Sequence, residues 1–247
     1  MITVDARMKR PLVRTFLAAA FLVAAAVGVL AYGLGDPSST LLGPALVRGV
    51  IRPGAPSEAA LTFDDGPTVP YTGQVLDILR RDRVHATFFL CGAGAERHPE
   101  LVRRIQAEGH AIGNHTYSHP YLHLKSEADI AAEIDRTQDI LQKITGRRPT
   151  LFRPPYGVRW FPLWALLRER GMTMVLWSAR GYDGRLDAGG IAKATLERLE
   201  PGAIILLHDG FEAKAPALVD RSSTVRALPA IIKGIRKAGY AFVRIPG

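Results

Sequence analysis

The chain has 247 residues, and its 32 lysines and arginines exceed its 23 aspartates and glutamates, which gives a formal net charge of +9. Apolar residues make up 47% and charged residues 22%, a balance that supports a buried core and excludes a largely disordered chain. The single cysteine, Cys91, excludes an internal disulfide and a metal site built from several thiolates.

The first 35 residues carry a basic cluster followed by an apolar run from Phe16 to Leu34. This order is typical of an export signal or a membrane anchor. A helix over the run spans roughly 28 Å at about 1.5 Å per residue, which favours an uncleaved anchor, whereas Val29-Leu30-Ala31 offers a cleavage site. We therefore predict a hydrophobic helix over residues 1–35 that contacts the membrane. The positive-inside rule places the rest of the chain outside the cytoplasm, anchored or, after cleavage, secreted.

Residues 36–56 are rich in proline, glycine and serine. Such a composition predicts a linker between the N-terminal segment and a folded domain. The domain is then expected to cover residues 57–247.

Short apolar runs alternate with amphipathic stretches throughout this domain. The runs predict strands over residues 59–63, 86–90, 111–113, 151–153, 173–177, 203–208 and 241–245. The stretches predict helices over residues 75–83, 100–108, 128–145, 160–170, 188–199 and 225–238. This order predicts an α/β fold with a mainly parallel sheet, closed or nearly closed into a barrel. In such folds the chemistry lies where the strands end.

The first predicted strand ends in Asp64 and Asp65, followed by a Gly-Pro turn. Adjacent side chains on an extended strand diverge, so one carboxylate can bind a metal while the other stays free as a base. An aspartate-rich turn without function is the alternative, and for this segment alone it is the commoner one.

His115 and His119 follow the third predicted strand. Their spacing predicts that both lie on one face of a helical turn, where two imidazoles can bind one divalent ion. With one aspartate they would leave positions open for water and substrate, as in a catalytic zinc site, although cobalt or manganese fits the same ligands.

Arg153 and a di-proline follow the next strand. The arginine can orient a carboxylate and the rigid prolines can aim a backbone N–H at an oxyanion, although a plain turn explains the segment equally well. His208 ends a later apolar strand and is a candidate general acid, because an ordinary histidine pKa lies near neutral pH.

Taken in order, these motifs resemble those of the polysaccharide deacetylases of carbohydrate esterase family 4, which share the NodB homology domain. The resemblance covers roughly residues 57–245 and implies a distorted (β/α) barrel. It implies that Asp64 is the general base and that a divalent metal, most often zinc, binds to Asp65, His115 and His119. The further roles that it implies are a positioning arginine at Arg153, an oxyanion-binding backbone N–H at Tyr156, a pocket-lining leucine at Leu206 and a general acid at His208.

The fourth motif departs from the family pattern. Asp183 is kept, and we expect it to pair with and orient His208. Arg180 stands where the family has an aspartate, and Gly184 stands where it has a tryptophan. These changes bear on substrate preference, and Arg180 and Trp177 are therefore candidate substrate-binding residues.

The resemblance implies a hydrolase that removes N-acetyl groups from N-acetylglucosamine residues of peptidoglycan or a chitin-like polymer. An O-acetyl polysaccharide esterase would use the same metal and base. The altered fourth motif also leaves open a catalytically silent carbohydrate-binding protein at the cell surface. The positive charge is spread along the chain without a nucleic-acid-binding motif, so we expect no nucleic-acid partner, and no protein partner can be inferred.

Overall fold

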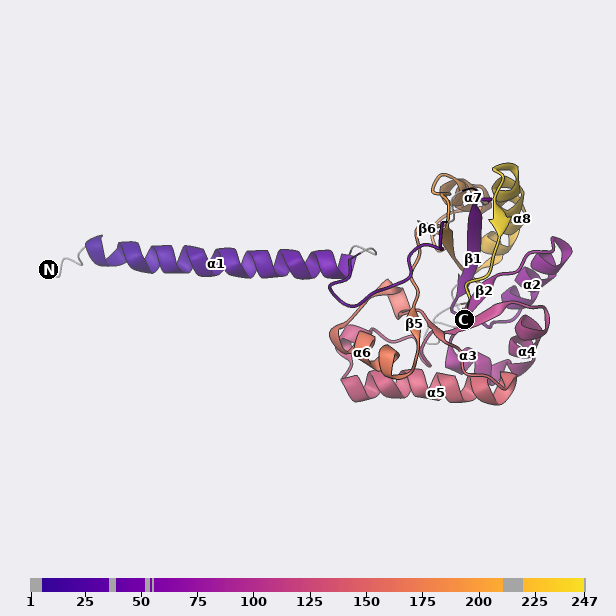
Figure 1. Ribbon diagram of the computed structural model, residues 1–247, viewed down its shortest axis with the longest axis horizontal. Helices are drawn as coiled ribbons and strands as arrows, with labels where there is room; N and C mark the ends of the chain where they lie inside the picture. The colour runs from indigo at the N-terminus through magenta and orange to yellow at the C-terminus, as the bar shows by residue number, and fades with distance from the viewer. Residues whose placement is uncertain (1–5, 36–38, 52–53, 55, 211–219, 247) are drawn as a thin grey trace.

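A parallel β-sheet lies at the centre of the domain (Figure 1). The computed structural model describes residues 6–35, 39–51, 54, 56–210 and 220–246. Within these residues, eight strands form one sheet in the order β5-β4-β3-β2-β1-β7-β6, and β8 pairs with β1. Their bounds are β1 Glu58–Asp64, β2 Thr87–Leu90, β3 Ala111–Asn114, β4 Leu151–Phe152, β5 Thr173–Met174, β6 Ala179–Arg180, β7 Ala203–His208 and β8 Ala241–Phe242. Each strand pair is parallel, as the alternation of strands and helices predicts.

The central strand β1 explains how the polar side chains come together. Leu61 and Phe63 point to one face of the strand and Ala60 and Thr62 to the other, and all four are buried, which suits a parallel strand covered on both faces. The register of β1 places Asp64 beside His208 of β7 on one side and beside Phe89 of β2 on the other. The parallel direction thus brings the carboxyl ends of the strands, with their polar residues, to one edge of the sheet.

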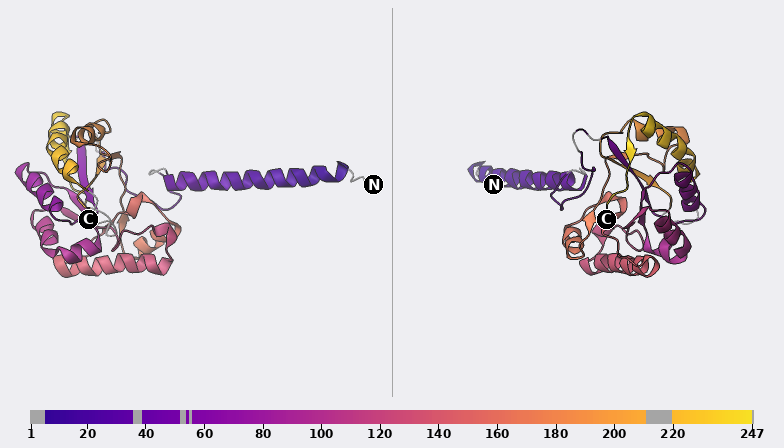
Figure 2. Two further views of the ribbon diagram at one scale, coloured as in Figure 1. Left: turned by 180° about the vertical axis from the view of Figure 1, so that it is seen from behind. Right: turned by 45° about the vertical axis from the view of Figure 1, so that its right-hand side comes forward.

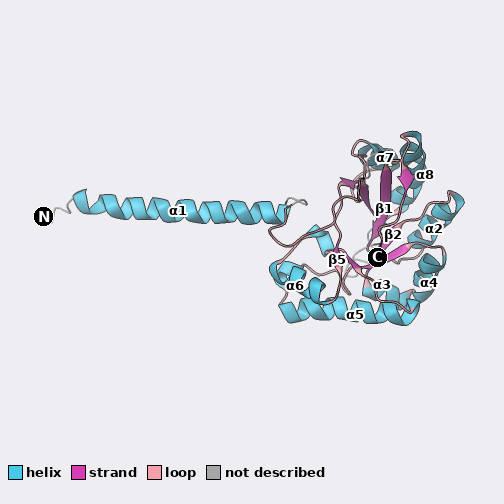
Figure 3. Cartoon of the chain, in the orientation of Figure 1, coloured by secondary structure: helices cyan, strands magenta, loops and turns pink. Residues whose placement is uncertain are grey.

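Helices pack around the outside of the sheet (Figure 2) and form the outer layer of the domain (Figure 3). Their bounds are α2 Tyr71–Arg81, α3 Gly92–Arg97, α4 Pro99–Ala107, α5 Glu127–Thr145, α6 Phe161–Glu169, α7 Ala188–Leu196 and α8 Ser222–Lys237, with short 3-10 helices η1 Leu122–Leu124 and η2 Pro155–Gly157. The longest of them, α5, begins after Ser126, whose hydroxyl accepts a hydrogen bond from the Asp129 backbone N–H. It ends at Gly146, whose φ of 76° forms a left-handed cap.

The helix α1 (Ala6–Gly35) extends away from the domain (Figure 1). The sequence predicts a helix here, and the helix is confirmed. Among the residues whose side chains are described, no helix is long and apolar enough to cross a membrane. The membrane contact of this segment stays a prediction.

Part of the predicted linker packs against the domain. Leu46 forms a parallel bridge to Val175, next to β5, and Arg48 forms an antiparallel bridge to Ala203 at the start of β7. Residues 39–49, called the strap below, therefore connect the segment after the end strand β5 to the start of β7. These pairings could not be predicted from composition. Proline and glycine indicate a break in regular structure, but they do not indicate which strands the intervening residues pair with.

The curled sheet is not closed. Its end strands β5 and β6 do not pair with each other in the described part of the chain. The predicted α/β fold, a distorted barrel with a parallel sheet, is confirmed. The helix α3 and the two-residue strand β6 were not predicted, because both are too short to show a periodic pattern.

Candidate active site

A cleft of about 380 Å³ opens at the carboxyl edge of the sheet. It is lined by nine residues that the sequence analysis singled out: Asp64, Asp65, His115, His119, Tyr156, Trp177, Arg180, Leu206 and His208. The other two, Arg153 and Asp183, lie behind the cleft wall as buried partners of Asp64 and His208. The structure therefore brings all eleven predicted residues to one place.

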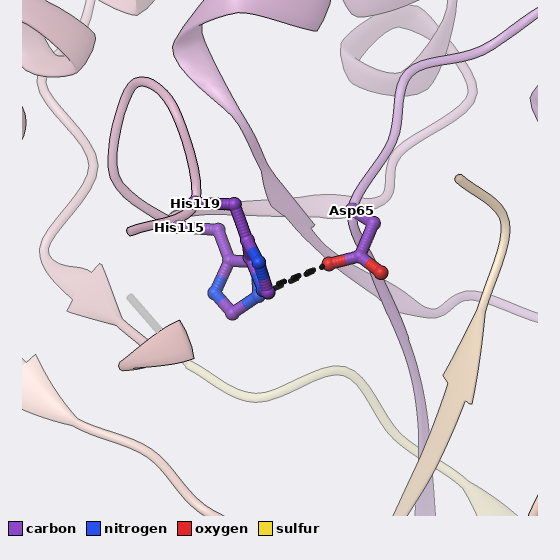
Figure 4. Close-up of side chains that lie close together, drawn as sticks. All are labelled: Asp65, His115 and His119. Carbon is purple, nitrogen blue, oxygen red and sulfur yellow. Dashed lines mark ion pairs between the residues drawn. The ribbon is translucent and has the colours of Figure 1, made fainter. Parts of the chain in front are cut away.

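Asp65, His115 and His119 form a buried cluster in which the ligand atoms lie within 4.8 Å of one another. The Asp65 Oδ1 atom is 3.4 Å from His115 Nε2 and 3.3 Å from His119 Nε2, and Figure 4 shows the three side chains converging. Two imidazole nitrogens and one carboxylate oxygen are a common ligand set for a catalytic divalent metal.

The two histidines do not lie on a helical turn, so the prediction of their local structure was wrong. Residues 115–119 form a loop in which Thr116 and His119 have positive φ angles of 66° and 55°. The Asn114 side chain accepts a hydrogen bond from the Thr116 backbone N–H at 2.8 Å, and the Thr116 hydroxyl accepts one from the His119 backbone N–H at 3.2 Å. These bonds satisfy the loop backbone and hold the imidazoles together, in place of helix geometry.

The hydrogen bonds around the cluster fit a cation. His115 Nδ1 donates to the Arg153 carbonyl at 2.7 Å, so Nε2 is the ring nitrogen that faces Asp65. The Asp65 Oδ1 atom is buried and has no hydrogen-bond partner among the described residues. The nitrogen of a neutral imidazole and a carboxylate oxygen are both acceptors, and a cation between them would satisfy both atoms. The residues present therefore fit a divalent metal.

The protonation states also suit metal ligands. Burial, followed by the positive potential of His115, lowers the pKa of His119 to about 4, which leaves its imidazole neutral at neutral pH. Burial opposes ionisation of Asp65, but the surrounding histidines outweigh it and hold the pKa of this carboxyl well below its usual range. A neutral imidazole at His119 and an ionised carboxylate at Asp65 are the forms that bind metals.

Asp64 is held by Arg153 rather than by the cluster. The buried guanidinium donates from Nη1 to Asp64 Oδ1 at 2.6 Å and to the Thr62 hydroxyl at 2.8 Å. It also donates from Nη2 to the Leu176 carbonyl at 2.9 Å. The second carboxylate oxygen, Asp64 Oδ2, lies 3.8 Å from His115 Nε2 and faces the cleft. Asp64 is thus oriented beside the metal site with one oxygen available to a proton.

His208 lies on another wall of the cleft and is paired with Asp183. Its Nδ1 is 2.8 Å from Asp183 Oδ1, and its backbone N–H donates to Asp183 Oδ2 at 2.7 Å. Thr224 donates a further hydrogen bond to Asp183. Burial lowers the pKa of His208, but the charge and hydrogen bond of Asp183, helped by Asp65, raise it to about 9. The imidazole is therefore a protonated acid at neutral pH, with Nε2 as its remaining N–H.

Aromatic side chains form the wall next to the metal cluster. Tyr156 has a positive φ of 59° and sets its ring edge-on to the His119 ring, with 4.6 Å between centroids. Its ring also stacks on Tyr121 at 4.1 Å, and half of Tyr121 is exposed. Trp177 packs against Gly157, where an added Cβ would lie 2.4 Å from the indole. Rings of this kind suit contact with sugar faces.

Two residues near the cluster were missed by the sequence analysis. Arg221 lines the cleft, with Nη2 at 3.5 Å from Asp65 Oδ2, and donates from Nε to the Gly210 carbonyl at 2.6 Å. Asp209 is fully buried and accepts a hydrogen bond from the Thr72 hydroxyl, and burial raises its pKa to about 7. The sequence shows Asp209 next to His208, but no motif connects Arg221 to the strand ends.

Comparisons with known proteins find similar sequences and a similar fold. The family model described as polysaccharide deacetylase matches residues 52–175. A peptidoglycan-N-acetylglucosamine deacetylase from Bacillus cereus is 39% identical over 190 residues, which cover 75% of this chain and 85% of that protein. A chitooligosaccharide deacetylase from a Bradyrhizobium species is 36% identical over 192 residues, or 75% of this chain and 88% of that protein. The crystal structure of the Bc1960 peptidoglycan N-acetylglucosamine deacetylase matches with a TM-score of 0.75 and 37% identity, over 82% of this chain and 90% of that one.

Proposed function

Because the chain belongs to the polysaccharide deacetylase family, we propose that it hydrolyses N-acetyl groups on N-acetylglucosamine residues of a cell-wall or extracellular polysaccharide, with peptidoglycan as the first candidate. The observation that carries the proposal is the cleft itself. The candidate metal cluster lines the same cleft as a carboxylate held by an arginine, Asp64, and a protonated imidazole held by a carboxylate, His208. A base and an acid on two walls of one cleft are what amide hydrolysis needs.

A divalent cation bound by Asp65, His115 and His119 would polarise the amide carbonyl and make the attacking water more acidic. Zinc is the first candidate for this cation, and cobalt and manganese fit the same ligand types.

The chain supplies the proton transfers. Asp64 Oδ2 accepts a proton from the water as its oxygen attacks the acetyl carbon, while Arg153 holds the other carboxylate oxygen. The Tyr156 backbone is proposed to stabilise the oxyanion that develops on the carbonyl oxygen. His208 Nε2 then donates its proton to the sugar nitrogen as the C–N bond breaks. Acetate and an amino sugar are released, and one water is consumed.

Export is part of the proposal. A peptidoglycan substrate lies outside the cytoplasm. Within residues 1–35 a basic cluster precedes an apolar run, which is the order found in an export signal. Protease treatment of cells checks this point. The test uses cells whose outer barrier has been removed: degradation of the domain then supports export, and full protection until the cytoplasmic membrane is lysed contradicts it.

Acetate release by the purified full-length chain tests the activity. The substrates are peptidoglycan, chitin oligosaccharides and acetylated xylan, each with metal-free and zinc-loaded protein. We expect zinc-dependent release from an N-acetylated polymer, and a loss of at least about a hundredfold with Asp64→Asn. The matched control is Asp139→Asn, a surface change far from the cleft. Release from xylan alone would assign the chain as an O-acetyl esterase, and no zinc-dependent release from any substrate would refute the proposal.

A further inference from the structure

Arg180 lies on the same face of the sheet as His208. In the register of β6 and β7, Arg180 pairs with Leu206. Leu206 and His208 are two residues apart on β7, so their side chains point to one face, roughly 7 Å apart along the strand. All three residues line the cleft. The register of a short strand therefore places Arg180 in the same cleft as the proposed general acid, on the neighbouring strand.

Two other guanidinium groups lie near the cleft, Arg221 in its lining and Arg153 behind its wall, and both have protein partners. Arg153 pairs with Asp64 at 2.6 Å, and Arg221 lies 3.5 Å from Asp65 and donates to a carbonyl. The exposed Arg180 has no such carboxylate within the described residues. Its guanidinium instead lies over the Tyr182 ring, 4.6 Å from the centroid.

The ring contact orients Arg180 without neutralising it. A cation over an aromatic face keeps its full charge, and its N–H donors stay available to an anion. Because the ring contact already orders the side chain, Arg180 loses less rotamer freedom when an anion binds. Arg198 lies over the same ring at 5.7 Å but is not among the residues that line the cleft. A planar guanidinium with free donors binds carboxylates in bidentate fashion.

We propose that Arg180 binds a carboxylate carried by the substrate, on a sugar next to the one that is deacetylated. The inference rests on the proposed function and makes it more specific. The preferred polymer is an acidic glycan, in which N-acetylglucosamine alternates with a carboxylate-bearing sugar such as muramic acid with a free lactyl group. A neutral chitin-like chain has no group for this arginine and is the poorer substrate.

Three tetrasaccharides test the inference with the full-length, zinc-loaded chain. The first alternates N-acetylglucosamine with N-acetylmuramic acid and has free lactyl carboxylates, the second carries the same lactyl groups as methylamides, and the third is chitotetraose. We expect kcat/KM for acetate release to be about tenfold higher for the carboxylate than for the methylamide. The preference decreases as salt is added, because the ion pair is screened.

Substitutions then assign the preference to one side chain. Arg180→Gln is expected to reduce the ratio of the two kcat/KM values to about one, and Arg180→Lys, which keeps the charge but not the bidentate fork, to an intermediate value. The matched control is Arg198→Gln, which removes the other cation on the Tyr182 ring and keeps the ratio.

Each outcome bears on a separate statement. No acetate release from any of the three tetrasaccharides counts against the proposed function. Release without a preference for the carboxylate, or a preference that does not change with salt, overturns the inference and leaves the proposed function in place. A preference that Arg180→Lys and Arg180→Gln both retain assigns carboxylate binding elsewhere and overturns it as well.

Discussion

The pairing of His208 with Asp183 predicts how the activity depends on pH. The ordinary pKa of histidine is 6.5, and in this fold the charge of Asp183 outweighs burial and raises the pKa of His208 to about 9. At about 1.4 kcal/mol per pKa unit, the difference corresponds to roughly 3 kcal/mol in favour of the imidazolium. Because the folded-state pKa is the higher one, this stabilisation is fully present below pH 6.5 and is lost as the pH rises through about 9.

Asp183→Asn removes the charge and keeps the size of the side chain. We expect the His208 pKa to fall by about 1–2 units, since an opposite charge at this distance accounts for shifts of that size. The proton that His208 donates to the leaving amine is then lost at lower pH. The apparent pKa of the alkaline limb of the kcat/KM profile therefore falls by about 1–2 pH units, and the maximal rate falls about tenfold or more.

The assay is acetate release by zinc-loaded protein over a range of pH, with a direct titration of the His208 ring by NMR. Asp65 also raises the pKa of His208, and a bound metal offsets that charge, so the effect of Asp183 is best isolated in the metal-loaded state. Thr224→Val is the matched control, because it removes one hydrogen bond to Asp183 but leaves the charge. An Asp183→Asn variant with the wild-type alkaline limb and ring pKa would refute the reasoning.

Three further predictions concern the metal, the buried arginine and the strap. Asp65→Ala should weaken zinc binding about a hundredfold in a chelator competition, and His123→Ala, outside the cluster, should not; equal affinities would contradict the assignment. Arg153→Met leaves a buried carboxylate without its partner and should lower the free energy of unfolding in urea by about 3–5 kcal/mol, whereas an unchanged midpoint would show that the pair is not needed. Leu42→Ala in the strap, where 3% of Leu42 is exposed, should cost about 2–3 kcal/mol. Leu41→Ala, at 49% exposed, should cost less than about 0.5 kcal/mol, and similar losses for the two would mean that the strap does not pack as described.

The chemistry of the site could be predicted from the sequence because parallel strands end at one edge. Asp64 and His208 lie far apart in the chain, yet both end apolar runs, and the register pairs them directly. Arg153 also follows a strand, β4, and its place beside Asp64 follows from the same rule. Residue type and position at a strand end were therefore enough to bring acid, base and ligands together.

Features that depend on long-range pairing could not be predicted in this way. Arg221 reaches Asp65 from the segment before α8, and no local pattern relates the two. The strap pairs with Val175 and Ala203 through backbone bridges that any side chain can form. In both cases the partner is chosen by tertiary packing, which hydrophobic periodicity does not encode.

The local backbone at the site explains why residue types were predicted better than their conformations. Six described non-glycine residues have positive φ, and four of them, Asp65, Thr116, His119 and Tyr156, lie at or next to the metal cluster. Each costs roughly 1–2 kcal/mol, so local preference alone would select other conformations. Close packing holds the first of them in place: a Cβ at Gly210 would lie 2.3 Å from the Asp65 backbone, and glycine permits this approach. The turn at Asp65 separates its carboxylate from that of Asp64. The sequence alone attributes this separation to the alternation of side chains along an extended strand. Backbone strain at the candidate metal ligands is expected, because the fold holds their side chains in a geometry that suits a cation. The local backbone alone would favour other φ angles.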